Sequence, residues 1–213
     1  MLKKFNLKNK TAIVTGAGGL LGFEHAFALL EVGANVVLTD INSKSLNINF
    51  KKLIKIFPKK KIIKFKIDVT SEKSVLKCLK FLKKKKIFAE ILINNASFNP
   101  SNDKFKLFTL ENYSLANWRK EIDVSLTGAF ICSKIFGTEM SKKNSGVILN
   151  VASDLSVIAP DHRIYNSGNR IKFVKPITYS VGKTGLIGLT RYLSTYWLKS
   201  NVRCNAISPG GVM

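Results

Sequence analysis

Residues 11–30 read TAIVTGAGGLLGFEHAFALL, a stretch in which a strand pattern passes directly into a helix pattern. The apolar run at 11–15 is short and ends in glycine, which predicts a buried strand. From about 20 to 32 the apolar residues recur at helical spacing, which predicts an amphipathic helix. Four glycines separate the two patterns: Gly16, Gly18, Gly19 and Gly22. The stretch therefore predicts a strand, a tight turn and a helix, the opening unit of an α/β fold.

The same alternation continues along the chain. Strand candidates rich in Val and Ile lie at 35–39, 61–67, 90–94, 146–152 and 202–208. Between them, helical spacing of apolar residues occurs at about 43–57, 71–85, 115–143 and 179–199. Such alternation predicts parallel strands with helices on both faces. We expect an α/β fold, a three-layer doubly wound parallel sheet, in a single domain spanning residues 1–213.

The composition is that of a globular protein, with 46% apolar and 23% charged residues, but the formal net charge is +22. Such a charge suggests nucleic acid or an anionic surface as a partner. Only five of the 35 basic residues are arginine, and the lysines are scattered along the chain. Because arginine is the better fork for phosphates and bases, we predict no specific nucleic-acid partner. Nucleic-acid binding through diffuse lysine charge stays open as an alternative.

The cysteines and histidines indicate the redox state of the compartment and whether the chain could form a metal site. Cys78, Cys132 and Cys204 are far apart in hydrophobic contexts, which predicts buried free thiols in a reducing compartment. Two histidines, His25 and His162, are too few for a typical histidine metal centre, so no metal site is predicted. No apolar run approaches the ~20 residues of a membrane helix, and the N-terminus lacks the apolar core of a signal peptide. We therefore expect a cytoplasmic protein without a membrane partner.

The glycine loop predicts a dinucleotide site. Glycines let the backbone approach a pyrophosphate closely, and the helix after them presents free amide groups to it. We expect Leu20 and Leu21, within the loop, to contact the cofactor. Asp40 ends the next strand, followed by Ile41, and a carboxylate there binds the ribose 2′-hydroxyl and repels a 2′-phosphate, which favours NAD over NADP. Alternatively, Asp40 caps the helix that begins near Ser43.

Two residues near the C-terminal end of the sequence are candidates for general acid–base catalysis. Tyr179 and Lys183 stand four residues apart in ITYSVGKTGLIGL at 177–189, so their side chains share one helix face. A fixed ammonium beside a phenol favours its ionised form and so makes a proton donor or acceptor. By spacing alone, the pair is also compatible with an ordinary helix surface.

Several motifs occur together in a specific order: TGAGGLLG, KIDVT, INNAS, LNVAS, YSVGK and NAISPGG. In this respect essentially the whole chain resembles the short-chain dehydrogenase/reductase family. The resemblance implies a Rossmann fold that binds NAD and transfers a hydride between the nicotinamide and a secondary alcohol or ketone. It implies that Ser153 orients the substrate oxygen, that Tyr179 exchanges the proton and that Lys183 holds the nicotinamide ribose.

The resemblance also implies the rest of the site. Further cofactor-binding residues would be Asp68, Val69, Asn95, Ala96, Ser97, Pro209, Gly210 and Val212. The family pairs its subunits through the helices at about 115–143 and 179–199, which implies a homodimer or homotetramer with a small-molecule substrate.

Three features depart from the family pattern: the spacing of the glycines in the loop and the residues at two later positions. The spacing of Gly16, Gly19 and Gly22 fits the extended branch, which works on nucleotide sugars, so an enzyme of that branch is one alternative. Ser97 replaces a glycine. Ser125 replaces an asparagine that holds a water in the proton path; its hydroxyl can hold a water with fewer bonds, or bond its own helix backbone. A dinucleotide-binding protein without turnover is therefore a second alternative.

The segment between Ser153 and Tyr179 is about twice as long as the resemblance leads us to expect. We predict that it lies at the mouth of the site and that Arg163 or Arg170 binds an anionic sugar derivative, such as a sugar phosphate or nucleotide sugar. A solvated or oligomer-facing loop is the alternative. SDLSVIAPD at 153–161 and VKPITYSVGKTGLIGLTRYLSTYW at 174–197 resemble PtmA-type oxidoreductases of flagellin and nonulosonic-acid pathways. Because the chain stops at SPGGVM, where the family continues, we expect a fragment without the lid and last strand.

Overall fold

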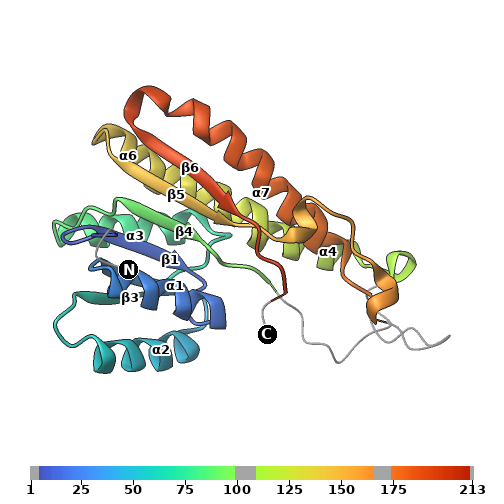
Figure 1. Ribbon diagram of the computed structural model, residues 1–213, viewed down its shortest axis with the longest axis horizontal. Coiled ribbons are helices and arrows are strands. Elements are labelled where there is room, and N and C mark those ends of the chain that lie inside the picture. The colour runs from blue at the N-terminus through green and yellow to red at the C-terminus, as the bar shows by residue number, and fades with distance from the viewer. Residues whose placement is uncertain (1–4, 99–108, 166–173, 212–213) are drawn as a thin grey trace.

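The computed structural model describes residues 5–98, 109–165 and 174–211. It contains a six-stranded sheet in the order β3-β2-β1-β4-β5-β6, in which every neighbouring pair is parallel (Figure 1). The strands are β1 (Thr11–Thr15), β2 (Asn35–Asp40), β3 (Ile62–Lys66), β4 (Ile91–Asn94), β5 (Gly146–Val151) and β6 (Val202–Ile207). The predicted doubly wound sheet is confirmed, and its strand order reverses direction between β1 and β4, the point where such sheets bind ligands.

Each predicted helix is present, with shifted ends. Four are α1 (Leu20–Glu31), α2 (Ser43–Ile56), α3 (Glu72–Lys84) and α7 (Ile177–Tyr196). The predicted helix at 115–143 consists of α4 (Leu115–Ile122), η4 (Asp123–Thr127), α5 (Gly128–Cys132), η5 (Ser133–Gly137) and α6 (Thr138–Lys142). Short 3₁₀ helices that the periodicity did not predict are η3 (Leu110–Asn112), η6 (Asp154–Ser156), η7 (His162–Tyr165) and η8 (Leu198–Ser200).

The long helix departs from the prediction because η4 and η5 are π-helical turns. A π turn widens the backbone by one residue and so changes which side chains face inward. Ser125 in η4 and Ser133 in η5 are both buried. The helical spacing of apolar residues over 115–143 did not predict these two turns.

The helices form two layers around the sheet (Figure 1). Alternate residues of each strand point to opposite faces. On one face Ala12 and Val14 pack in a core with residues of α1 and α2. On the other, Ile13 packs with residues of α3, of the 115–142 helix and of α7. The two layers hold the carboxyl ends of the strands together at one edge, where the glycine loop and the start of α7 also lie.

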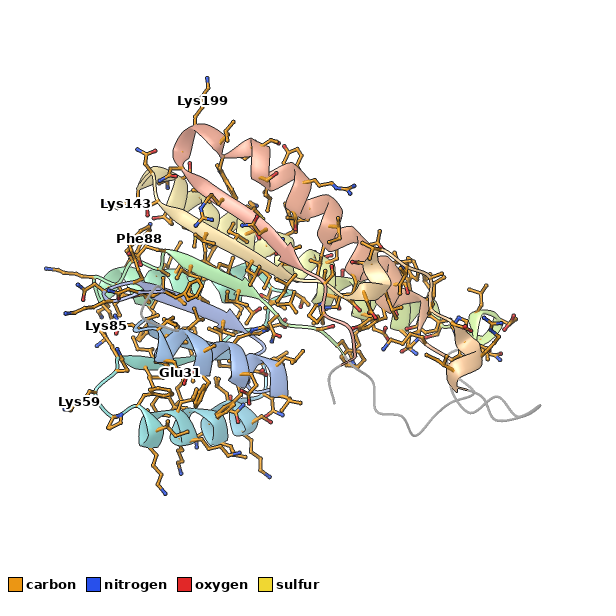
Figure 2. All side chains as sticks on the ribbon, in the orientation of Figure 1. Glu31, Lys59, Lys85, Phe88, Lys143 and Lys199 are labelled. Carbon is orange, nitrogen blue, oxygen red and sulfur yellow. The ribbon has the colours of Figure 1, made fainter. Side chains whose placement is uncertain are left out.

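The predicted burial of the three cysteines is confirmed: Cys78, Cys132 and Cys204 are all buried and free. Burial raises the pKa of the Cys78 thiol to about 12, so this group stays protonated near neutral pH. Lys59, Lys143 and Lys199, in contrast, project outward at separate edges of the molecule (Figure 2). None of the helices in the described ranges combines the length and the apolar character needed to cross a bilayer.

Candidate active site

Two adjoining clefts open at the carboxyl ends of the strands. The loop cleft, about 350 Å³, lies between the glycine loop and the ends of β2 and β3. The tyrosine cleft, about 670 Å³, lies between the end of β5 and the start of α7. Four residues line both clefts: Leu20, Leu21, Asn95 and Ser97. The two clefts therefore form one crevice, long enough in principle for a ligand with two separate halves.

The glycine loop forms the floor of the loop cleft. Gly16 has a φ of +67°, a conformation that only glycine adopts without strain. A side chain at Gly22 would overlap the carbonyl oxygen of Gly16, so the helix can approach the loop only as glycine. Gly19 caps α1 without a side-chain hydrogen bond, which leaves the first amide groups of the helix for a ligand. These features fit the pyrophosphate of a dinucleotide.

Asp40 lies at the end of β2 and lines the loop cleft together with Ile41. Its Oδ2 accepts a hydrogen bond from the Gly18 amide at 2.9 Å, and its Oδ1 accepts one from the Asn42 amide at 2.8 Å. The alternative that Asp40 caps the next helix is wrong. Asn42 is the cap, because its side chain accepts from the amides of the first turn of α2. Asp40 is thus fixed beside the glycine loop, where a ribose of a bound dinucleotide would lie.

The far wall of the loop cleft follows β3. Asp68 and Val69 both line it, as predicted. The Asp68 Oδ1 accepts hydrogen bonds from the amide and the hydroxyl of Thr70, which fixes the turn after the strand. Val69 packs against Gly128, where an added Cβ would lie 2.7 Å from a Val69 methyl group. This close approach holds the wall against the long helix.

The end of β4 is tied to the end of β1 by a residue that the sequence reasoning missed. The Thr15 hydroxyl oxygen accepts from the amides of Asn95 and Ala96, each at 3.0 Å, and donates to the Ile93 carbonyl at 3.2 Å. The Asn95 side chain donates to the Thr15 carbonyl at 2.9 Å. This junction fixes the backbone on which Asn95, Ala96 and Ser97 stand. A threonine at a strand end carries no signal of that role in the sequence.

Ser125 does not bond only its own helix. Its hydroxyl oxygen lies 3.2 Å from that of Ser97, which lines both clefts. The alternative of a purely local helix residue is therefore wrong, and Ser125 is coupled to the crevice through Ser97.

Tyr179 and Lys183 lie on the first two turns of α7 and line the tyrosine cleft. Lys183 is only 6% exposed, and its Nζ donates to the Val151 carbonyl at 2.6 Å. Burial, assisted by the nearby charge of Lys175, lowers the pKa of Lys183 to about 8. The Lys183 Nζ lies 5.8 Å from the centre of the Tyr179 ring. The predicted proximity of the two side chains is present, and an anchor at the end of β5 holds it.

Ser153 follows β5 and lines the same cleft as Tyr179 and Lys183. Its hydroxyl donates to Asp154 Oδ1 at 2.7 Å and accepts from the Leu155 amide at 3.2 Å. The hydrogen bond from Ser153, with that from Leu155, lowers the pKa of the Asp154 carboxyl. The fold therefore brings Ser153 into one cleft with Tyr179 and Lys183, which follow much later in the sequence, and adds a carboxylate, Asp154, that the sequence reasoning did not select.

Lys175 belongs to the long segment between Ser153 and Tyr179, and no sequence motif indicates its position. Its Nζ lies 3.9 Å from the centre of the Tyr179 ring, and its half-buried side chain lines the tyrosine cleft. Burial lowers the pKa of Lys175, and the charge of Asp154 opposes that shift.

The remaining predicted residues have mixed positions. Pro209 and Gly210 line the tyrosine cleft. The guanidinium of Arg163 forms an ion pair with Asp161, with Nη2 and Oδ2 2.8 Å apart; its side chain is 91% exposed. Asp161 is among the lining residues of the cleft, whereas Arg163 is not. Arg170 and Val212 lie outside the described residues.

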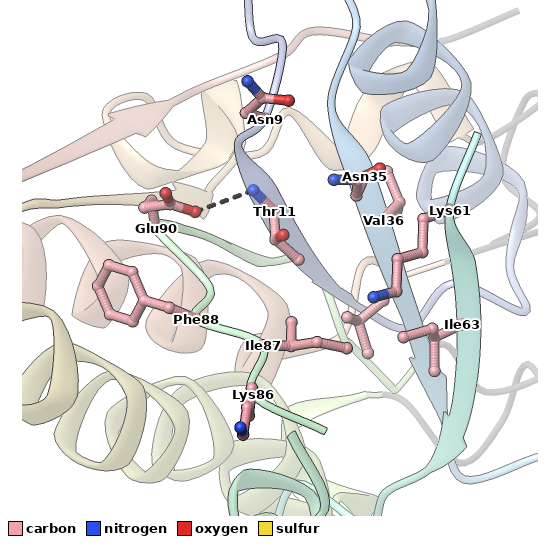
Figure 3. Close-up of a pocket in the computed structure, with 11 residues that line it drawn as sticks. Asn9, Thr11, Asn35, Val36, Lys61, Ile63, Lys86, Ile87, Phe88 and Glu90 are labelled. Carbon is pink, nitrogen blue, oxygen red and sulfur yellow. Dashed lines mark hydrogen bonds between the residues drawn. The ribbon is translucent and has the colours of Figure 1, made fainter. Parts of the chain in front are cut away.

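A further cleft lies at the opposite edge of the sheet, beside the starts of β1, β2 and β3 (Figure 3). Its carboxylate, Glu90, accepts from the Thr11 amide at 2.9 Å and forms an ion pair with Lys10. None of the site residues predicted from the sequence lines it. In the described part of the chain, no three His, Cys, Asp or Glu side chains are grouped as metal ligands would be.

Comparison with known proteins agrees with this geometry. The short chain dehydrogenase family profile matches residues 10–213. An NAD-dependent glycerol dehydrogenase of Listeria innocua is 30% identical over 207 residues, which are 97% of this chain and 72% of that protein. A 3-oxoacyl-[acyl-carrier-protein] reductase FabG of Buchnera aphidicola is 32% identical over 204 residues, 96% of this chain and 74% of that protein.

Among solved structures, an NAD⁺-bound xylitol dehydrogenase superposes with a TM-score of 0.82 at 28% identity, covering 99% of this chain and 74% of that one. The matched profile spans the glycine loop, both clefts and the Ser153, Tyr179 and Lys183 group. The chain therefore belongs to the short-chain dehydrogenase/reductase family and is a nicotinamide-dependent oxidoreductase that acts on CH–OH groups.

Proposed function

We propose that this chain interconverts a secondary alcohol and a ketone with NAD(H), using Tyr179 to exchange the proton, Ser153 to bind the substrate oxygen and Lys183 to hold the nicotinamide ribose. One observation carries the proposal. The three side chains line a single cleft that continues into the glycine loop, and Lys183 is buried with its Nζ on the Val151 carbonyl.

The chemistry divides between cofactor and chain. A bound nicotinamide ring accepts or gives the hydride. In the oxidation direction the carbinol C–H bond breaks with its electron pair, and the O–H proton passes to the Tyr179 oxygen as the carbonyl forms. The Ser153 hydroxyl now donates to Asp154, so it must rotate toward the cleft before it can donate to the substrate oxygen. Lys183, already oriented by the Val151 carbonyl, keeps further donors for ribose hydroxyls.

The preference for NAD over NADP belongs to this proposal and rests on Asp40. Its carboxylate lines the loop cleft beside the glycine loop, where a 2′-phosphate would meet like charge. A fluorescence titration with NADH and NADPH tests it. We expect tighter binding of NADH, and a loss of that preference in Asp40→Ala. Glu31→Ala, at the exposed far end of α1, is the matched control. Equal binding of both dinucleotides by the unaltered chain would refute the preference.

We propose a sugar derivative of surface-glycan synthesis as the substrate, on the resemblance of residues 153–161 and 174–197 to PtmA-type enzymes. The volume of the tyrosine cleft, about 670 Å³, and the charged residues Asp154, Asp161 and Lys175 in its lining support this proposal. A panel of sugar phosphates and nucleotide sugars with NAD tests this. Turnover of only non-sugar alcohols would contradict it.

A protein that binds the dinucleotide without turnover is the second candidate, favoured by the Ser153 hydroxyl donating to Asp154. Single-turnover absorbance at the nicotinamide band decides between the two. Hydride transfer that Tyr179→Phe abolishes supports the enzyme, whereas saturable NADH binding with no transfer on any panel member supports the second candidate.

We also propose a homo-oligomer that pairs through the long helix and α7. Large apolar side chains are exposed on these helices, among them Leu115 at 60%, Phe130 at 49% and Val181 at 40%. Light scattering tests the assembly. We expect a mass of two or four chains, reduced in Phe130→Lys, and a monomer at all concentrations would contradict it.

A further inference from the structure

Two ammonium groups converge on the Tyr179 ring. The Lys175 Nζ lies 3.9 Å and the Lys183 Nζ 5.8 Å from its centre. The two lysines are close enough for the charge of Lys175 to contribute to the lowered pKa of Lys183. The two ammonium groups thus lie beside the ring of the residue that the proposed reaction uses, in a cleft that Asp154 and Asp161 also line.

The two lysines differ in what they bond. Lys183 donates to the Val151 carbonyl. The Lys175 ammonium has no hydrogen-bond acceptor and no carboxylate within ion-pair distance among residues 5–98, 109–165 and 174–211, and it lies over the Tyr179 ring. A half-buried ammonium with unused donors has lost water without gaining a full set of partners.

The two carboxylates that line the same cleft as Lys175, Asp154 and Asp161, already have hydrogen-bond donors. Asp154 accepts from the Ser153 hydroxyl and the Leu155 amide, and it acts on Lys175 only through its charge. Asp161 holds the Arg163 guanidinium. A ring face attracts a cation less strongly than an anion does. Among the described residues, Lys175 therefore has no carboxylate within ion-pair distance, and its side chain lines the cleft in which a substrate would lie.

We propose that Lys175 binds an anionic group of the substrate, a carboxylate or a phosphate, while the carbinol of the same molecule reaches Tyr179. This inference rests on the proposed function, because it takes Tyr179 as the proton-exchanging group. The Tyr179 hydroxyl belongs to the ring that Lys175 covers, so the anion and the carbinol lie within a few bonds of each other. The substrate class is then a hydroxy acid or a polyol phosphate, and a neutral polyol leaves Lys175 without its partner.

Chemical labelling tests this without requiring turnover. The chain is acetylated with a low concentration of acetic anhydride in the presence of gluconate, glycerol 3-phosphate or xylitol. The modified lysines are then quantified by mass spectrometry. We expect gluconate or glycerol 3-phosphate to slow the labelling of Lys175 several-fold, and xylitol to leave it unchanged. Lys199 is exposed and follows the C-terminal end of α7, whereas Lys175 precedes its start, so Lys199 is the internal reference. The anion that protects Lys175 from labelling shows whether the site binds a carboxylate or a phosphate. Equal labelling under all three conditions overturns the proposal.

Variants locate the effect. Calorimetry on the NADH-saturated chain should give a Kd for the protecting anion that is about 10- to 100-fold weaker in Lys175→Met, the range of a charged hydrogen bond, and is largely restored in Lys175→Arg. Lys199→Met should bind as the unaltered chain does. Unchanged binding in Lys175→Met, or a loss confined to Arg163→Met, overturns the proposal. A titration of the same samples with NADH distinguishes the two proposals. If NADH does not bind, the proposed function fails. Labelling in the absence of NADH still tests whether Lys175 binds the anion.

Discussion

The hydroxyl oxygens of Ser97 and Ser125 lie 3.2 Å apart and join the loop after β4 to the π-helical turn η4. Both residues occupy positions where the sequence departs from the pattern of its family. The two departures therefore meet in space, and the hydroxyl of Ser97 provides a partner that Ser125, with its short side chain, can reach. The pair also places a polar contact between the crevice and the buried face of the long helix.

A double-mutant cycle on this pair should show coupling. Ser97→Ala and Ser125→Ala each remove one hydroxyl, and the double variant should lose less than the sum, with a coupling free energy of about 0.5–1 kcal/mol in urea unfolding. Ser141→Ala, whose hydroxyl bonds Ser200 far from the crevice, provides an additive control with Ser97→Ala. If the losses of unfolding free energy for Ser97→Ala and Ser125→Ala are strictly additive, the contact between the two hydroxyls contributes no stability.

Gly22 should tolerate no side chain. In Gly22→Ala the new methyl group would overlap the Gly16 carbonyl, so α1 must move away from the loop, at a cost of about 1–3 kcal/mol in the free energy of unfolding. NADH binding should weaken in the same variant, because the first amides of α1 shift. Gly19→Ala is the matched control for stability: its added Cβ would lie at an ordinary 3.4 Å from the Gly16 oxygen, and the loss should stay below about 1 kcal/mol. Similar losses in both variants would contradict the steric argument.

The buried Lys183 gives the stability a defined pH dependence. Burial lowers the pKa of Lys183 to about 8 in the folded chain, below its unfolded value. Between about pH 8 and 10 the unfolded chain binds more protons at this residue, so its contribution to the unfolding free energy rises with pH. From pH 7.5 to 9.5 the unaltered chain should gain about 2 kcal/mol relative to Lys183→Met. A difference that is flat or falls with pH would rule out the buried, partly deprotonated amine.

Thr178, the residue before Tyr179, should matter for stability although it lines neither cleft. It is 2% exposed, and its hydroxyl donates to the buried Glu121 and lies 2.7 Å from the Tyr113 hydroxyl. Thr178→Val keeps the shape but removes the donor to a buried carboxyl group, which should cost about 1–3 kcal/mol in urea unfolding. Thr195→Val, exposed on the same helix, should change it by less than about 0.5 kcal/mol. A Thr178→Val variant as stable as the control would show that Glu121 finds another donor.

The sequence alone determined the layered α/β fold, because strand and helix periods alternate along it and the glycine loop marks the first turn. It also selected Asp40, Ser153, Tyr179 and Lys183, since each is placed by a short local motif. These motifs are recognisable because each lies at a strand end or on one helix face. The contacts that fix Asp40 and Lys183, with Gly18 and Val151, come from distant parts of the chain.

The tertiary structure decided what depends on contacts between distant segments. The pairing of Ser97 with Ser125, the junction at Thr15 and the π turns of the long helix have no local signature. The place of Lys175 in one cleft with Asp154 and Lys183 likewise depends on how the end of β5 packs against the start of α7. A charge in a sequence has no fixed partner until the fold sets its distance to every other charge and to water.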